Sequence, residues 1–173
     1  MKIYFATHAT STDNENGLAS GWSDPKLSAL GQKQAKALAS YFENIPLDLI
    51  CVSDLKRAQQ TVRLAFGAKF PVLFDSRLRE INYGDYTGRP AAEVDSLRLE
   101  MIDKPFPGGE SYQQAMTRLH QFYRELKEAH SEKTVLIIGH RATQYGLDTL
   151  VLGKDLVQVI RPLVWQPYWE YDF

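Results

Sequence analysis

Two short apolar runs, one near each end of the chain, stop at a histidine. Residues 3–5 form the first run, and His8 follows three positions later. Residues 134–139 form the second, and His140 follows at once. Runs this short and this rich in β-branched residues predict buried strands. Because ligands of open α/β sheets bind beyond the carboxyl ends of the strands, we expect both histidines at one site. The simpler alternative for His8 is that it caps a loop.

Strands and helices alternate along the rest of the chain. We expect further strands at 47–52 and 72–74, and one or two more in the tail, 156–173. We expect helices at 28–42, 55–66, 91–101, 111–129 and 142–152, the second of them capped by Ser53 or Asp54. This alternation predicts an α/β fold, a three-layer α/β/α sandwich around a mainly parallel central sheet. The length and the lack of an internal linker predict a single domain over residues 1–173.

Composition argues against several classes of partner. The formal net charge is -1 and no dense Lys/Arg patch occurs, so we expect no nucleic-acid partner. No apolar run approaches the roughly 18 residues of a membrane helix, and the first run is too short for a signal peptide. We therefore expect a cytoplasmic protein without a membrane partner. The single cysteine, Cys51, lies in an apolar run and is expected to be buried; it supports neither a disulfide nor a zinc cluster.

Two more residues complete a chemical set at the expected sheet edge. Arg57 falls in the first turn of the predicted helix 55–66, where the helix dipole disfavours a cation. A cation there suggests a bound anion nearby, the alternative being a solvated arginine. Glu80 lies in a turn-rich segment beside Arg79, which could simply be its salt-bridge partner. We expect Arg57 and Glu80 near the two histidines.

This set suits phosphoryl transfer. An imidazole with a pKa near ~6.5 can be neutral at cellular pH and can form a covalent intermediate. Phosphoryl transfer requires in-line positioning and positive hydrogen-bond donors around the equatorial oxygens. Arg57 and a second histidine would supply those donors, and Glu80 could protonate the leaving oxygen.

Six segments occur in a recognisable order. They are Thr7-His8-Ala9 followed by Ser11 and Asn14, then LSALGQKQA (27–35), SDLKRAQQT (53–61), LREINYG (78–84), PGGES (107–111) and IGH (138–140). Together they resemble the motifs of the histidine phosphatases, the phosphoglycerate-mutase-like superfamily. The resemblance covers the chain to about Gly153.

The resemblance implies roles for these residues. His8 would be the nucleophile that forms a phosphohistidine, and Glu80 would be the proton donor. Arg57 and His140 would hold the phosphoryl group with help from Asn14, and no metal or other cofactor is required. The remaining candidates for contact with substrate are Thr7, Ser11, Trp22, Tyr83 and Arg141. The implied activity is metal-independent hydrolysis of a small phosphomonoester, such as a sugar phosphate, a ribazole-like phosphate or phosphohistidine on a protein.

The chain departs from the family pattern around the first histidine. Thr7 stands where the family has arginine, and it offers one neutral hydroxyl in place of a charged fork. Loss of one such donor costs on the order of 10²–10³ in rate. Ala9 replaces a glycine, and Arg141 follows His140 where a small residue is usual. We hypothesise that Arg141 replaces the lost charge; the alternative is that it points to solvent or to Asp148.

Two other functions use the same fold. A non-catalytic module that binds or senses a phosphorylated ligand would explain Thr7, but it would not need both a nucleophile and an acid. A mutase is also possible within the same chemistry, although the chain is short for one. The aromatic tail, 165–171, is expected either in the core or an edge strand, or on a substrate or dimer surface. We expect a monomer or a homodimer.

Overall fold

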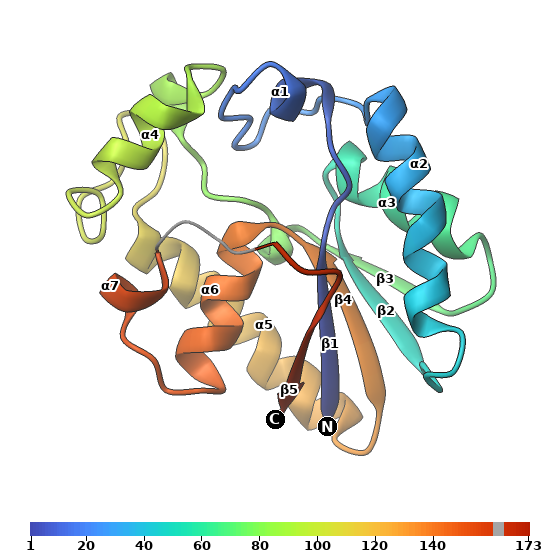
Figure 1. Cartoon of the computed structure of the whole chain (residues 1–173). Coiled ribbons are helices and arrows are strands. Elements are labelled where there is room, and N and C mark those ends of the chain that lie inside the picture. Colours follow the sequence, from blue (N-terminus) through green and yellow to red (C-terminus); the bar gives the residue numbers. More distant parts are fainter. Residues whose placement is uncertain (161–164) are drawn as a thin grey trace.

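A five-stranded sheet forms the centre of the computed structural model, which describes residues 1–160 and 165–173 (Figure 1). The strand order is β3-β2-β4-β1-β5. The strands are β1 (Lys2–Thr7), β2 (Leu49–Ser53), β3 (Val72–Asp75), β4 (Thr134–Gly139) and β5 (Trp169–Asp172). The first four are parallel to one another, and β5 pairs antiparallel with β1. The predicted α/β fold with a mainly parallel sheet is confirmed.

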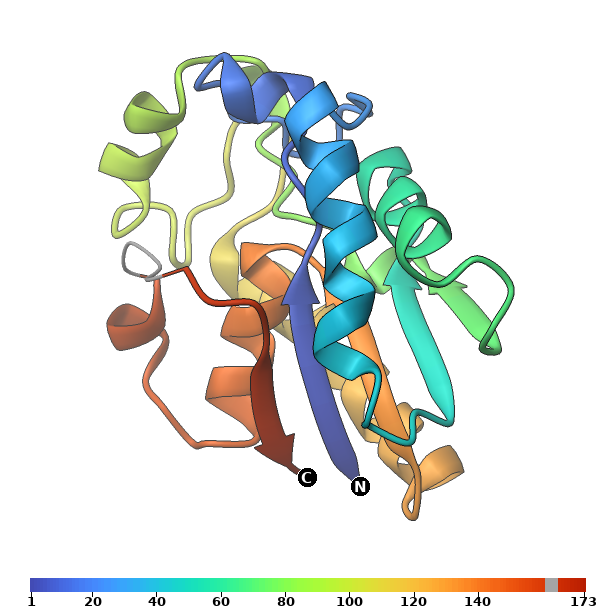
Figure 2. The same cartoon turned by 45° about the vertical axis from the view of Figure 1, so that its right-hand side comes forward.

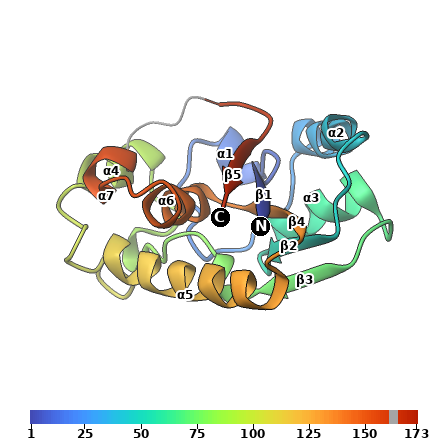
Figure 3. The ribbon, with the colours of Figure 1, turned by 90° about the horizontal axis from the view of Figure 1, so that it is seen from below.

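Helices cover both faces of this sheet. They are α1 (Thr12–Glu15), α2 (Ala29–Leu38), α3 (Lys56–Phe66), α4 (Ala91–Leu97), α5 (Tyr112–His130), α6 (Arg141–Leu150) and α7 (Leu156–Val159). Figure 3 shows α2 and α3 on one side of the strands and α5 and α6 on the other. None of the helices in the described part of the chain is long and apolar enough to cross a membrane.

The core is divided between the two faces because successive side chains of a strand point in opposite directions. On β1, Ile3 and Phe5 belong to the cluster that packs against α5 and α6. Ala6 belongs to the other cluster, which packs against α2 and α3. Cys51 is buried in the first cluster, as expected, and burial raises the pKa of its thiol to about 12.

Some expected boundaries were wrong. Helix α3 has Leu55 at its N-cap, not Ser53 or Asp54. Ser53 ends β2, and the Asp54 carboxylate accepts hydrogen bonds from Arg79 at 2.7 and 2.6 Å. The helix expected over 91–101 ends at Leu97.

The long loop and the tail each contain one short helix that was not expected, whereas a strand was expected in the tail. The polar segment after His8 contains the short helix α1. The tail forms one strand, β5, preceded by the helical turn α7; residues 161–164 lie outside the described part.

The strand register brings the two histidines together. Thr7 pairs with Gly139 at the ends of β1 and β4, so His8 and His140 leave the sheet side by side. A side chain at Gly139 would collide with Thr143, whose hydroxyl accepts a hydrogen bond from the His140 N–H at 2.9 Å. Figures 1 and 2 show α1 and α4 above this edge of the sheet, with both chain ends at the opposite edge.

Candidate active site

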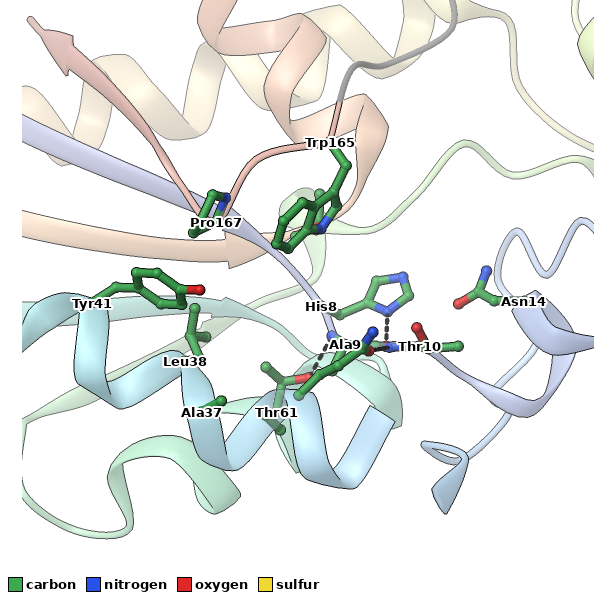
Figure 4. A pocket seen from close by; sticks show the side chains of 13 residues that line it. His8, Ala9, Thr10, Asn14, Ala37, Leu38, Tyr41, Thr61, Trp165 and Pro167 are labelled. Carbon is green, nitrogen blue, oxygen red and sulfur yellow. Dashed lines mark hydrogen bonds between the residues drawn. The ribbon is translucent and has the colours of Figure 1, made fainter. Parts of the chain in front are cut away.

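His8 presents one ring nitrogen to the site. Its Nδ1 lies 2.7 Å from the carbonyl oxygen of Ala9, and because a carbonyl only accepts, Nδ1 carries the proton (Figure 4). Nε2 therefore keeps its lone pair, and it accepts a hydrogen bond from Arg57 Nε at 3.3 Å. Burial and the neighbouring Arg57 charge lower the pKa of His8 to about 3. The ring is thus neutral and oriented as a nucleophile.

Arg57 lies between the two imidazoles and is buried. Its Nη1 and Nη2 donate to the carbonyl oxygens of Ser23 and Gly21, each at 2.9 Å. The same guanidinium reaches His8, and its Nη2 lies 3.4 Å from His140 Nδ1. The alternative of a solvated Arg57 is wrong, since only 2% of the residue is exposed. Two backbone carbonyls thus hold this guanidinium between the two imidazole rings.

The ring of His140 is oriented by Ser53, which was expected only as a possible helix cap. Its Nε2 lies 2.8 Å from the hydroxyl of Ser53, at the end of β2. Since Nδ1 faces an arginine donor, Nε2 carries the proton and donates to Ser53. Burial, followed by the Arg57 charge, lowers the pKa of His140 well below its usual value. Ser53 belongs to the SDLKRAQQT segment, but its distance of 87 residues from His140 concealed the contact.

Glu80 lies at the N-terminus of α6. Its Oε1 accepts hydrogen bonds from the N–H groups of Ile81 at 2.9 Å and Ala142 at 3.2 Å. Its Oε2 accepts from the N–H of Arg141 at 3.3 Å. Arg79 pairs with Asp54 instead, so a simple Arg79–Glu80 pair is ruled out as the explanation for Glu80. The α6 N-terminus fixes the carboxyl group beside His140.

A second, half-buried arginine holds the segment that carries Glu80. Arg118 on α5 donates to the carbonyl oxygens of Arg77 at 2.6 Å, Arg79 at 2.9 Å and Glu80 at 2.9 Å. It also pairs with Glu110 at 2.6 Å. These contacts of Arg118 could not be predicted, because in the sequence Arg118 is only one of several polar positions on an amphipathic helix.

Two cavities meet at His8. The first, of about 430 Å³, is lined by Thr7, His8, Asn14, Glu80, Asp95, His140, Arg141 and Trp165. The second, of about 460 Å³, extends toward α2 and shares Thr7, His8, Asn14 and Trp165 with the first (Figure 4). The first cavity therefore brings together the two imidazoles, two carboxyl groups and the Arg141 guanidinium.

Comparison with known proteins decides the family. Residues 3–163 match the model of the histidine phosphatase superfamily, branch 1. The chain belongs to the histidine phosphatase superfamily. Phosphoserine phosphatase 1 of Hydrogenobacter thermophilus is 32% identical over 165 residues, which cover 90% of this chain and 78% of that protein.

Further relatives of this chain differ in their named substrates. The adenosylcobalamin/alpha-ribazole phosphatase of Escherichia coli is 29% identical over 162 residues, or 88% of this chain and 80% of that protein. The crystal structure of the alpha-ribazole phosphatase from Shigella flexneri superposes with a TM-score of 0.87 at 26% identity, covering 99% of this chain and 90% of that one. The relatives support a phosphatase activity and confirm the phosphoglycerate-mutase-like fold.

Three residues that were expected to contact substrate instead make contacts within the loops of the protein. Ser11 is fully buried and caps α1 in a reciprocal arrangement with Asn14. The Trp22 indole donates to the carbonyl oxygen of Glu80 at 2.7 Å, and the Tyr83 ring packs against Phe106. Ser11, Trp22 and Tyr83 line neither of the two cavities described above.

Arg141 occupies the position that the charge-replacement hypothesis requires. It is the first residue of α6 and lines the first cavity with Glu80 and His140. Its Nη1 lies 3.8 Å from Asp95 across that cavity. Asp148 is engaged elsewhere, since it accepts a hydrogen bond from the Tyr171 hydroxyl at 2.8 Å. The alternative of an Arg141–Asp148 pair is therefore wrong.

His8 is expected to stay neutral through the pH range in which a free histidine titrates, near ~6.5. The reason is burial beside Arg57, which lowers its pKa to about 3. Between these two pH values the unfolded chain binds a proton at His8 and the folded chain does not, so acidification destabilises the fold. The ring signals of His8 in an NMR titration should not move near pH ~6.5. A His8 titration near that pH would contradict the assignment; a histidine in an unstructured peptide is the control.

Proposed function

We propose that this chain is a metal-independent phosphatase that hydrolyses a small phosphomonoester through a phosphohistidine on His8. One observation carries the proposal. The lone pair of His8 Nε2 faces the Arg57 guanidinium at 3.3 Å, in a site whose cavity also holds the Glu80 carboxyl group. A neutral nucleophile, an anion-binding cation and an acid are the groups that stepwise phosphoryl transfer needs.

In the first step, His8 Nε2 attacks phosphorus. The N–P bond forms as the ester P–O bond breaks, and the leaving oxygen takes a proton from the Glu80 carboxyl group. Arg57 stabilises the negative charge on the equatorial oxygens, and His140, which lies 3.4 Å from Arg57 Nη2, positions that guanidinium. Both are held before substrate arrives, Arg57 by two backbone carbonyls and His140 by Ser53, so little reorganisation is needed.

In the second step, water takes the place of the departed alcohol. The Glu80 carboxylate accepts a proton from the water, the oxygen attacks phosphorus, and the N–P bond breaks to release inorganic phosphate and neutral His8. Atoms and charge balance without a further co-reactant. In the parts of the chain that the structure describes, no group of three His, Cys, Asp or Glu side chains is arranged to hold a metal ion.

Arg141 is proposed to supply the charge that Thr7 lacks. Arg141→Ala is expected to lower kcat/KM by about 10²–10³, the cost of one transition-state donor. Arg124→Ala, at an exposed position of α5, is the matched control and should leave kcat/KM unchanged. Adding Thr7→Arg to Arg141→Ala should restore part of the loss. Unchanged turnover and phosphate affinity in Arg141→Ala would contradict the role.

The decisive assay is hydrolysis of p-nitrophenyl phosphate and a panel of small phosphomonoesters with EDTA present. The proposal predicts turnover by the wild-type chain. The neutral Thr7 favours one competing function, a module that only binds phosphorylated ligands. Absence of turnover together with binding of orthovanadate would overturn the proposal in favour of that module. Absence of both would mean that the fold is retained without the chemistry.

A further inference from the structure

We infer that the alcohol part of the substrate is uncharged and carries an apolar ring, which lies in the cavity between α2 and residues 165–167. This inference rests on the proposed function, because it assigns the leaving group of the same reaction. It goes further because it names the preferred substrates: phosphate esters of an uncharged alcohol with an apolar ring, rather than esters of a charged alcohol.

The second cavity has an apolar wall on each side. Ala37 and Leu38 of α2 and Tyr41 of the following turn form one wall, and Trp165 and Pro167 form the other. Figure 4 shows the Tyr41 and Trp165 rings on opposite sides of the cavity, with His8 at one end. A volume of about 460 Å³ falls within the range of small-molecule sites.

The charge of the lining separates the two cavities. Among the described residues that line the second cavity, none is Asp, Glu, Lys or Arg. A carboxylate or ammonium group placed there would lose hydration and gain no ionic partner from these described residues. The first cavity, by contrast, contains Glu80, Asp95 and Arg141. We assign the phosphoryl group to the first cavity because His8, whose Nε2 faces Arg57, and Arg141 line it, and we assign an uncharged alcohol group to the second cavity.

The two cavities are joined where the reaction takes place. Thr7, His8, Asn14 and Trp165 line both of them. An ester whose phosphorus lies near His8 Nε2 and whose leaving oxygen lies near Glu80 can extend past Thr7 and Trp165 toward Tyr41. The short side chain of Thr7 occupies little of this passage. Continuity with the catalytic groups makes a substrate group the occupant that fits this cavity best.

The aromatic walls are unusually accessible. Trp165 is 70% exposed and Tyr41 is 45% exposed. An apolar ring bound between them would cover both surfaces and favour binding through burial of apolar area. The Tyr41 ring is also held by neighbouring aromatic rings. It contacts Tyr168 at a centroid distance of 6.5 Å, and Tyr168 contacts Phe42 at 5.2 Å.

The test compares three primary alkyl esters with the same type of leaving oxygen: ethyl phosphate, phenethyl phosphate and O-phosphoserine. The phenyl ring should raise kcat/KM by about 10- to 100-fold over ethyl phosphate, the effect of burying one aromatic ring. O-phosphoserine should be no better than ethyl phosphate, since its ammonium and carboxylate groups find no oppositely charged side chain among the described residues that line the second cavity.

A cavity-filling variant links the preference to this site. Ala37 is exposed on α2, so Ala37→Trp can fill the cavity without disturbing the core. It should lower the phenethyl-to-ethyl ratio of kcat/KM by about tenfold. Ala129→Trp, at an exposed position of α5 outside both cavities, should leave the ratio unchanged.

Binding of ethylphosphonate and phenethylphosphonate, measured by calorimetry, separates this inference from the proposed function. Turnover without a phenethyl preference, or with a preference for O-phosphoserine, would overturn the inference and leave the phosphatase proposal intact. Tighter binding of phenethylphosphonate that Ala37→Trp removes, without turnover of any ester, would support the ring site and refute the hydrolysis. Absence of both turnover and binding preference would refute both.

Discussion

Replacing His8 with alanine is expected to reduce phosphomonoester hydrolysis by a factor on the order of 10⁴ or more, as removal of a nucleophile does in other covalent mechanisms. His8 Nε2 is the lone pair that faces Arg57, and the other ring nitrogen is occupied by Ala9. His140 also has a lone pair near Arg57, at Nδ1, but its ring is held on the other side by the Ser53 hydroxyl. The measurement is kcat for p-nitrophenyl phosphate in EDTA.

His120→Ala is the control for His8→Ala. The His120 ring contacts the Thr149 hydroxyl at 2.8 Å on the α5–α6 side of the protein and lines neither cavity. We expect His120→Ala to retain turnover at a temperature where both variants remain folded. His8→Ala should still bind orthovanadate, because its backbone partners continue to hold Arg57. Turnover by folded His8→Ala at the wild-type rate would exclude His8 as the nucleophile.

Glu80→Gln is expected to reduce hydrolysis of an alkyl ester by about 10²–10⁴, the usual contribution of a general acid. An alkoxide needs a proton as it leaves, and in the proposed mechanism that proton comes from Glu80, whose carboxyl group is held at the N-terminus of α6. A p-nitrophenolate leaves without a proton, so its formation should be reduced much less. The measurement is single-turnover release of each alcohol.

The dependence on the leaving group distinguishes proton donation from a structural effect of Glu80→Gln. Glutamine retains one acceptor oxygen for the N–H groups that Glu80 binds, and disruption of the loop would slow both esters alike. Glu128→Gln, at an exposed position of α5, serves as the control and should change neither rate. Equal losses for ethyl phosphate and p-nitrophenyl phosphate would remove Glu80 from the role of acid.

The central strands of the sheet could be predicted because each is a short apolar run in the sequence. β4 is a continuous apolar run bounded by polar residues, as expected for a strand covered on both faces, and β1 has the same character. The shared edge at His8 and His140 then followed from parallel pairing. The short helix α1 was missed because its capping pair, Ser11 and Asn14, lies in a polar segment without an apolar stripe.

The candidate site was less predictable wherever it depends on contacts between distant segments. Ser53 reaches His140, and Arg118 reaches the carbonyl of Glu80 from a helix expected only to fill the core. Trp22 was expected to touch substrate, yet its N–H is used to satisfy that same carbonyl. Buried loops must pair their backbone groups, and this demand competes with ligand contact for the same side chains.

Threonine at position 7, where the family has arginine, has two consequences for the site. Its neutral hydroxyl takes the place of a charged group at the first cavity, which Arg141, the proposed replacement, also lines. The same short side chain lines the passage to the apolar second cavity. The sequence predicts the first consequence, whereas the second depends on the placement of Tyr41 and Trp165 around that passage.

The most direct test of the account is to trap the covalent intermediate. Wild-type protein and His8→Ala would be mixed with p-nitrophenyl phosphate in EDTA, quenched on the millisecond scale in base, and analysed by intact and peptide mass spectrometry. The account predicts one phosphoryl group on the wild-type chain, located on His8, stable in base and lost in acid, and none on His8→Ala. A phosphoryl group on another residue, or turnover with a pre-steady-state burst of p-nitrophenol but an unmodified His8, would contradict it.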